Sequence, residues 1–71
     1  MLESYLNSIR DSRCTFDDGL NKVLEFTRQH RGSVRHETVE DVTVWHVTLP
    51  SGDSATCFKP YDDINLFYFE S

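Results

Sequence analysis

The chain has 71 residues, of which 38% are hydrophobic and 13% aromatic, and a formal net charge of −5. This length suffices for one domain and is too short for two, and the share of apolar residues argues against disorder. The negative charge is concentrated in residues 36–71, which hold seven Asp and Glu side chains and a single basic one, Lys59. Such a surface repels phosphate backbones, so we expect this half not to bind nucleic acid directly.

The N-terminal segment has the spacing of a short amphipathic helix. Apolar side chains recur at positions i, i+3, i+4 and i+7, which places them on one face of a helix over residues 2–11. Charged residues interrupt the apolar pattern, so the segment predicts neither a signal peptide nor a membrane span. We therefore expect a cytoplasmic protein. The apolar residues of this face are Leu2, Tyr5, Leu6 and Ile9.

A second helix is expected over residues 16–31. Thr15 can accept a hydrogen bond from a free N–H group of the first turn, as N-cap residues do. Gly32 is the expected left-handed residue after the helix end. Gly19 lies inside this helix and should weaken it by about 1 kcal/mol relative to Ala.

After Gly32 the apolar period changes to two, which indicates strands. Acidic, Pro and Gly residues between the apolar runs predict turns. We expect one α+β domain over residues 1–71, with two N-terminal helices followed by a three- to four-stranded antiparallel β-meander sheet. The expected strands are 33–39, 42–49, 54–59 and 64–69, joined by turns at 40–41, 50–53 and 60–63.

With these turns, residues opposite each other share a face of the sheet. One face is a core face that the long helix should cover. The other face is also apolar at its centre, which is unusual for a sheet with one helical layer. Either the first helix crosses to this second face, which we favour, or a partner covers it. The core face would hold Val34, His36, Thr38, Thr43, Trp45, Val47, Leu49, Thr56, Phe58, Phe67 and Phe69. The second face would hold Arg35, Glu37, Val39, Val42, Val44, His46, Thr48, Ala55, Cys57, Lys59, Ile64, Leu66 and Tyr68.

The same register places His46 opposite Cys57. A thiolate–imidazolium pair is what a nucleophilic cysteine needs, but no oxyanion-forming turn or third residue accompanies this one. We therefore interpret the two residues as a packing pair and expect no enzyme activity. The His and Cys residues also lack the close spacing of metal ligands, and no Gly-rich phosphate loop is present. We expect no metal and no cofactor.

The leading functional hypothesis is a small non-enzymatic protein that binds another protein and regulates or inhibits it. Its acidic loops could imitate the phosphate track of a nucleic acid and occupy a basic, nucleic-acid-binding surface of the partner. Small inhibitors encoded by phages and mobile elements are of this type, which is an analogy of class and not of family. The candidate partner-binding residues are Glu40, Asp41, Asp53, Asp62, Asp63, Tyr61 and Tyr68.

Two alternatives remain open. One is an obligate homodimer with a scaffold or accessory role, which would pair through the second sheet face or through the edge strand Ile64–Phe69. The other is a small cysteine-dependent enzyme that uses Cys57 and His46.

Overall fold

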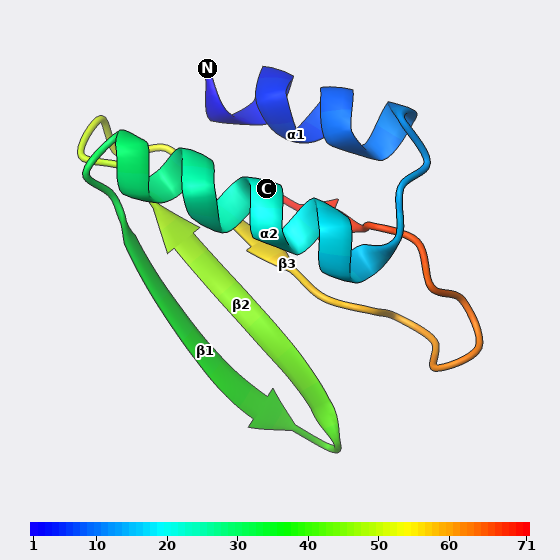
Figure 1. Cartoon of the computed structure of the whole chain (residues 1–71). Helices are drawn as coiled ribbons and strands as arrows, with labels where there is room; N and C mark the ends of the chain where they lie inside the picture. Colours follow the sequence, from blue (N-terminus) through cyan, green and yellow to red (C-terminus); the bar gives the residue numbers. More distant parts are fainter.

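A computed structural model describes all 71 residues (Figure 1). The strands form one antiparallel sheet in the order β1-β2-β3-β4, so the predicted α+β arrangement of two helices and a meander sheet is confirmed. The elements are α1 (Leu2–Asp11), α2 (Phe16–Gln29), β1 (Ser33–Val39), β2 (Val42–Thr48), β3 (Ser54–Cys57) and β4 (Phe69–Glu70).

Both helices pack on the same face of the sheet, which we call the inner face. In Figure 1 α1 lies alongside α2, and a single buried cluster joins Leu6 of α1 and Val23 of α2 to Val47 and Cys57 of the sheet. These four side chains have no exposed surface. The expectation that α1 would cross to the second face is therefore wrong. The opposite face, which we call the outer face, is left without a helical layer.

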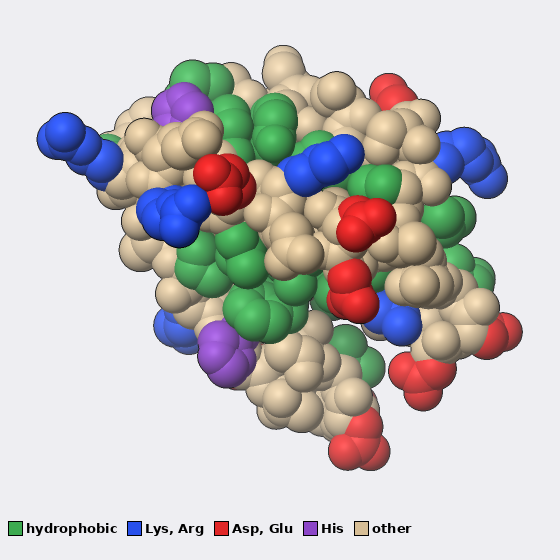
Figure 2. Space-filling model, in the orientation of Figure 1, with side chains coloured by type: hydrophobic (Ala, Val, Ile, Leu, Met, Phe, Trp, Pro, Cys, Tyr) green, Lys and Arg blue, Asp and Glu red, His purple; other side chains and the backbone are tan.

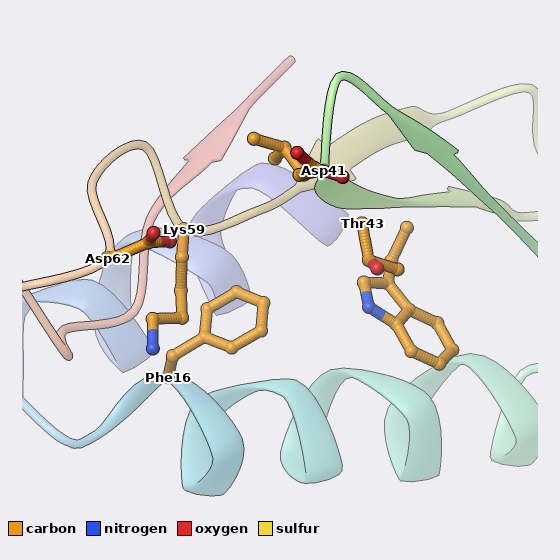
Figure 3. A pocket seen from close by; sticks show the side chains of 7 residues that line it. Phe16, Asp41, Thr43, Lys59 and Asp62 are labelled. Carbon is orange, nitrogen blue, oxygen red and sulfur yellow. The ribbon is translucent and has the colours of Figure 1, made fainter.

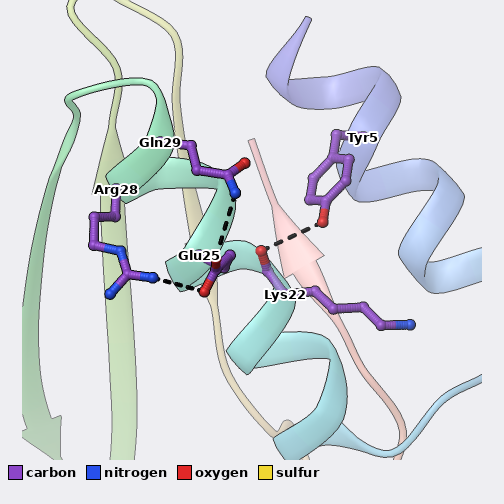
Figure 4. A network of polar contacts seen from close by, with 5 residues as sticks. All are labelled: Tyr5, Lys22, Glu25, Arg28 and Gln29. Atoms are coloured by element: carbon purple, nitrogen blue, oxygen red, sulfur yellow. Dashed lines mark hydrogen bonds and ion pairs between the residues drawn. The ribbon is translucent and has the colours of Figure 1, made fainter.

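The packing of α1 on α2 is partly aromatic. The rings of Tyr5 and Phe26 stack with centroids 4.1 Å apart. The Tyr5 hydroxyl donates to the backbone oxygen of Lys22 at 3.4 Å, while Glu25 accepts from Arg28 and Gln29 on the exposed side of α2 (Figure 4). Burial of an aromatic pair contributes about 0.5–1.5 kcal/mol beyond its area, which suits a domain with so small a core.

The ends of α2 follow the sequence closely, with one exception. The Thr15 hydroxyl accepts from the backbone N–H of Asp18 at 3.2 Å, as predicted for an N-cap. At the other end Arg31, and not Gly32, takes the left-handed conformation, with φ of 59°. The Gly32 N–H donates to the oxygen of Thr27 at 2.8 Å, which completes a Schellman motif. Arg31 is the left-handed C′ residue of this motif, and Gly32 is the C″ residue that follows it. A Cβ on Gly32 would lie 2.5 Å from the backbone oxygen of Thr48.

The hairpin of β1 and β2 has the predicted register, with Val39 opposite Val42. The next hairpin is shifted by one residue from the expectation. Its loop includes Leu49 as well as 50–53, and the Leu49 N–H donates to the oxygen of Asp53 at 2.8 Å. That bond extends the shifted pairing by one position beyond Thr48 and Ser54, and the Leu49 side chain stays buried, at 2% exposed, on the core face where the expectation also placed it.

This shift exchanges the faces of β3. Ala55 and Cys57 point to the inner face opposite Val47 and Trp45, while Thr56 lies on the outer face opposite His46. The predicted placements of Ala55, Cys57 and Thr56 are therefore wrong. The exchange buries two small apolar side chains under the helices and leaves the Thr56 hydroxyl accessible to polar neighbours, which avoids an unsatisfied polar group.

The last segment pairs far less than predicted. β3 ends at Cys57 and only Phe69–Glu70 forms a strand, so residues 64–68 are not an extended edge strand. The chain departs from the sheet because the Phe67 N–H donates to the oxygen of Cys14, at 3.2 Å, near the start of α2. This bond places the Phe67 ring in the core, where it is 4% exposed.

Gly19 is explained by the same ring. A Cβ built on Gly19 would lie 2.5 Å from Cδ1 and 2.7 Å from Cβ of Phe67. The glycine therefore lets Phe67 pack directly on the helix backbone, which offsets its low helix propensity.

Candidate protein-binding surface

Four of the seven candidate residues gather at one end of the molecule. Glu40 and Asp41 form the turn between β1 and β2, and Asp62 and Asp63 lie on the loop between β3 and β4. Figure 2 shows acidic side chains at the tip of the hairpin and on the neighbouring loop. None of the salt bridges of the structure involves these four residues. We call Glu40, Asp41, Asp62 and Asp63 the acidic end.

A shallow cleft of about 180 Å³ separates the two loops of the acidic end. Figure 3 shows Phe16, at the start of α2, between Lys59 and Asp62 on one side and Thr43 of the hairpin on the other. The cleft thus combines an apolar floor with carboxylates on both rims, and Lys59 is its single cation. The lining residues are Phe16, Asp41, Val42, Thr43, Trp45, Lys59 and Asp62.

The turn residues of the hairpin are held in an unfavourable conformation. Both Glu40 and Asp41 have positive φ, of 51° and 67°. A two-residue hairpin turn of this kind favours Asn or Asp at the first position and Gly at the second, because most side chains with a Cβ cost roughly 1–2 kcal/mol in the left-handed region, whereas Asn and Asp bond locally and Gly has no Cβ. Two carboxylates therefore occupy positions where local stability favours other residues.

The remaining candidates lie apart from the acidic end or next to it. Asp53 is in the loop between β2 and β3, at the opposite end of β2, with a carboxylate oxygen 4.0 Å from the N-terminal amine. Tyr61 belongs to the same loop as Asp62 and is 64% exposed. Tyr68 donates its hydroxyl to Glu70 at 3.1 Å, and this hydrogen bond to a carboxylate raises the pKa of Tyr68. The structure thus places Tyr61 on one loop of the acidic end, brings Tyr68 within electrostatic range of Tyr61, and separates Asp53 from the other candidates.

The outer face carries a row of three hydrogen-bonded polar side chains that the sequence did not predict. His46 lies between Glu37 and Thr56, with Nε2 2.9 Å from a Glu37 carboxylate oxygen and Nδ1 3.2 Å from the Thr56 hydroxyl. A hydroxyl, an imidazole and a carboxylate in a row resemble a nucleophile and its base, but they lie on an open sheet face. Glu37 and His46 were already on one predicted face; Thr56 was missed because of the shifted β3 register.

The predicted pairing of His46 with Cys57 is not formed. Cys57 faces the inner layer and has no exposed surface, while His46 lies on the outer face. Burial raises the pKa of the Cys57 thiol to about 12, so it is neutral at physiological pH and the nucleophilic thiolate is not populated. No three His, Cys, Asp or Glu side chains lie close enough together to hold a metal ion.

Comparison with known proteins found no matching family model, no similar curated protein and no similar solved structure. Neither helix has both the length and the apolar character needed to cross a bilayer.

Proposed function

We propose that the chain is a small non-enzymatic protein that binds a basic surface of another protein and thereby regulates or blocks it. The acidic end is the proposed contact surface. The observation that carries the proposal is the convergence of two acidic loops, about twenty residues apart in the sequence, on the two rims of one cleft.

Two further features support this assignment. The carboxylates of the acidic end are free of salt bridges, so their charge is available to a cationic partner. The turn residues Glu40 and Asp41 also adopt left-handed φ angles that Asn-Gly would adopt at lower cost. A residue choice that lowers local stability is expected where a contact surface requires it.

A basic surface that normally holds nucleic acid is the partner chemistry that fits best. Carboxylates spaced along two neighbouring loops present a row of negative charge, as a phosphate backbone does. Exposed Tyr61 beside Asp62 adds an aromatic ring, the type of side chain that is enriched at protein interfaces. The bound protein would then lose access to its nucleic acid.

The test compares two charge-matched variants as immobilised baits in a cell lysate. Asp41→Asn/Asp62→Asn removes two charges from the acidic end, and Asn tolerates the left-handed conformation at position 41. The control Glu3→Gln/Asp11→Asn removes two charges from α1, away from the cleft. We expect the wild type and the control to retain one or more proteins that the Asp41/Asp62 variant does not retain. Added duplex DNA or RNA should displace these proteins from the bait. Equal retention by all three baits, or no retained protein, would contradict the proposal.

A further inference from the structure

The edge strand β1 is long, regular and uncovered. All seven of its residues are exposed, and its pairing with β2 runs without a bulge from Ser33 to Val39. It contains neither Pro nor Lys, and its two charged side chains, Arg35 and Glu37, carry opposite signs, so they can attract a second copy of the strand instead of repelling it. The other edge of the sheet, β4, is only two residues long and offers little to pair with. β1 is therefore the place where a further strand can join the sheet.

The register identifies which backbone groups of β1 are free. The Leu49 N–H bonds to Asp53, so the odd-numbered residues of β2 direct their backbone groups to β3 and the even-numbered ones to β1. The β1 residues opposite those even-numbered residues are odd-numbered. It follows that the N–H and C=O groups of Val34, His36 and Thr38 point away from the sheet.

A second copy of β1 fits this edge in one antiparallel register. The free groups require pairing among even-numbered residues, and a twofold axis at His36 places Val34 opposite Thr38 of the second copy. In this register Arg35 lies opposite Glu37 of the second copy, and Glu37 opposite its Arg35, on the outer face. Shifting the axis to residue 35 or 37 would oppose two arginines or two glutamates. Charge complementarity therefore selects the axis at His36.

We propose that the chain forms a homodimer through antiparallel pairing of β1 with β1, which joins two four-stranded sheets into one continuous sheet. The four helices then lie on one side of this sheet. Because the two β1 strands run in opposite directions, their hairpins point apart and the two acidic ends lie at opposite ends of the dimer. The dimer does not depend on a partner at the acidic end, and its interface differs from the predicted edge at residues 64–69.

Charge variants at two positions test the register directly. Arg35→Glu opposes glutamates at both contacts between positions 35 and 37, and Glu37→Arg opposes arginines there. Each variant alone should raise the dimer dissociation constant at least about tenfold, since like charges placed opposite each other destabilise a strand pair. Mixed in equal amounts, the two variants should form a heterodimer, because each acidic position then meets a basic one. Glu3→Arg on α1 serves as the charge control, because it changes the net charge by two units, as Glu37→Arg does.

The measurement is light scattering with size exclusion over a concentration series, with circular dichroism to establish that each variant is folded. An interface of one strand pair is small, so we expect a dissociation constant on the order of micromolar. The expected result is a dimer for the wild type, monomers for each variant alone and a dimer for the mixture. A monomeric wild type at about a hundred times that concentration would overturn the proposal. Variants that dimerise as the wild type does, or a mixture that stays monomeric, would overturn it equally.

Discussion

Substitution of Gly19 by Ala gives opposite predictions from the sequence and from the structure. Helix propensity alone favours Ala over Gly in a helix interior by about 1 kcal/mol, which would stabilise α2. In the folded chain the added Cβ would lie 2.5 Å from the Phe67 ring and 2.7 Å from its Cβ. These are not the far atoms of a flexible side chain, so the core segment around Phe67 must move.

Overpacking of this kind costs about 1–3 kcal/mol. After subtraction of the propensity gain, Gly19→Ala should lower the free energy of unfolding by about 1 kcal/mol, with an upper limit near 2 kcal/mol. For a domain of this size that corresponds to a fall in Tm of roughly 4–8 °C per kcal/mol. Thermal and urea unfolding followed by circular dichroism measure both quantities.

Asn21→Ala provides the matched control for Gly19→Ala. Asn21 is exposed on the same helix, so its replacement changes propensity without crowding the core, and a gain of a few tenths of a kcal/mol is expected. If Gly19→Ala stabilises the chain by as much as propensity alone predicts, the packing of Phe67 on the backbone of α2 is wrong.

Three further outcomes are expected. Burial raises the pKa of Cys57 from 9.0 to about 12, so the unfolded thiol ionises first as the pH rises. The free energy of unfolding should therefore fall as the pH rises between these two values, by up to about 1.4 kcal/mol per pH unit. Urea titrations of a Cys57→Ala variant at the same pH values should lack this contribution to the pH dependence. Arg31→Gly should stabilise the chain by about 0.5–1 kcal/mol, because glycine adopts the left-handed conformation freely. The control Arg28→Gly, inside α2, should destabilise the chain by about 1 kcal/mol. Equal effects of the two variants in thermal unfolding would refute the Schellman motif at the end of α2. Glu40→Asn/Asp41→Gly should raise the free energy of unfolding by about 1–2 kcal/mol and reduce the retention of partner proteins in the bait assay described above. If the variant is stabilised and still retains the partner, the turn is not part of the binding surface.

The sequence predicted the elements whose signals are local. The apolar spacing of α1, the Thr15 cap of α2 and the two-residue turn of the first hairpin each depend on a few adjacent residues, and all three are confirmed. Helix periodicity and capping need no knowledge of the rest of the chain.

The errors arose where a distant contact decided the conformation. The register of β3 depends on where the loop after β2 closes, and Leu49 bonds to Asp53 instead of lying opposite Ser54. The final segment reads as a strand because it is apolar, yet the bond from Phe67 to Cys14 removes it from the ladder. A one-residue slip exchanges the faces of a strand, so the first error also created the His46–Cys57 pair that the fold does not form.

The candidate site was predicted in part for the same reason. The acidic turns are visible in the sequence, because turn residues are recognised locally. Their convergence around one cleft depends on the path of the loop between β3 and β4, which the sequence pattern does not contain. The outer-face row of Glu37, His46 and Thr56 required the correct β3 register.

The most direct test of the central claim is the affinity of a retained protein for the chain, measured by calorimetry at increasing salt. Exposed charge pairs contribute about 0.2–1 kcal/mol each, so Asp41→Asn/Asp62→Asn should weaken binding by up to about 30-fold, and the loss should shrink as salt rises. The Glu3→Gln/Asp11→Asn control should stay within about twofold of the wild type. Equal weakening by both double variants, or binding that does not respond to salt, would contradict recognition through the acidic end.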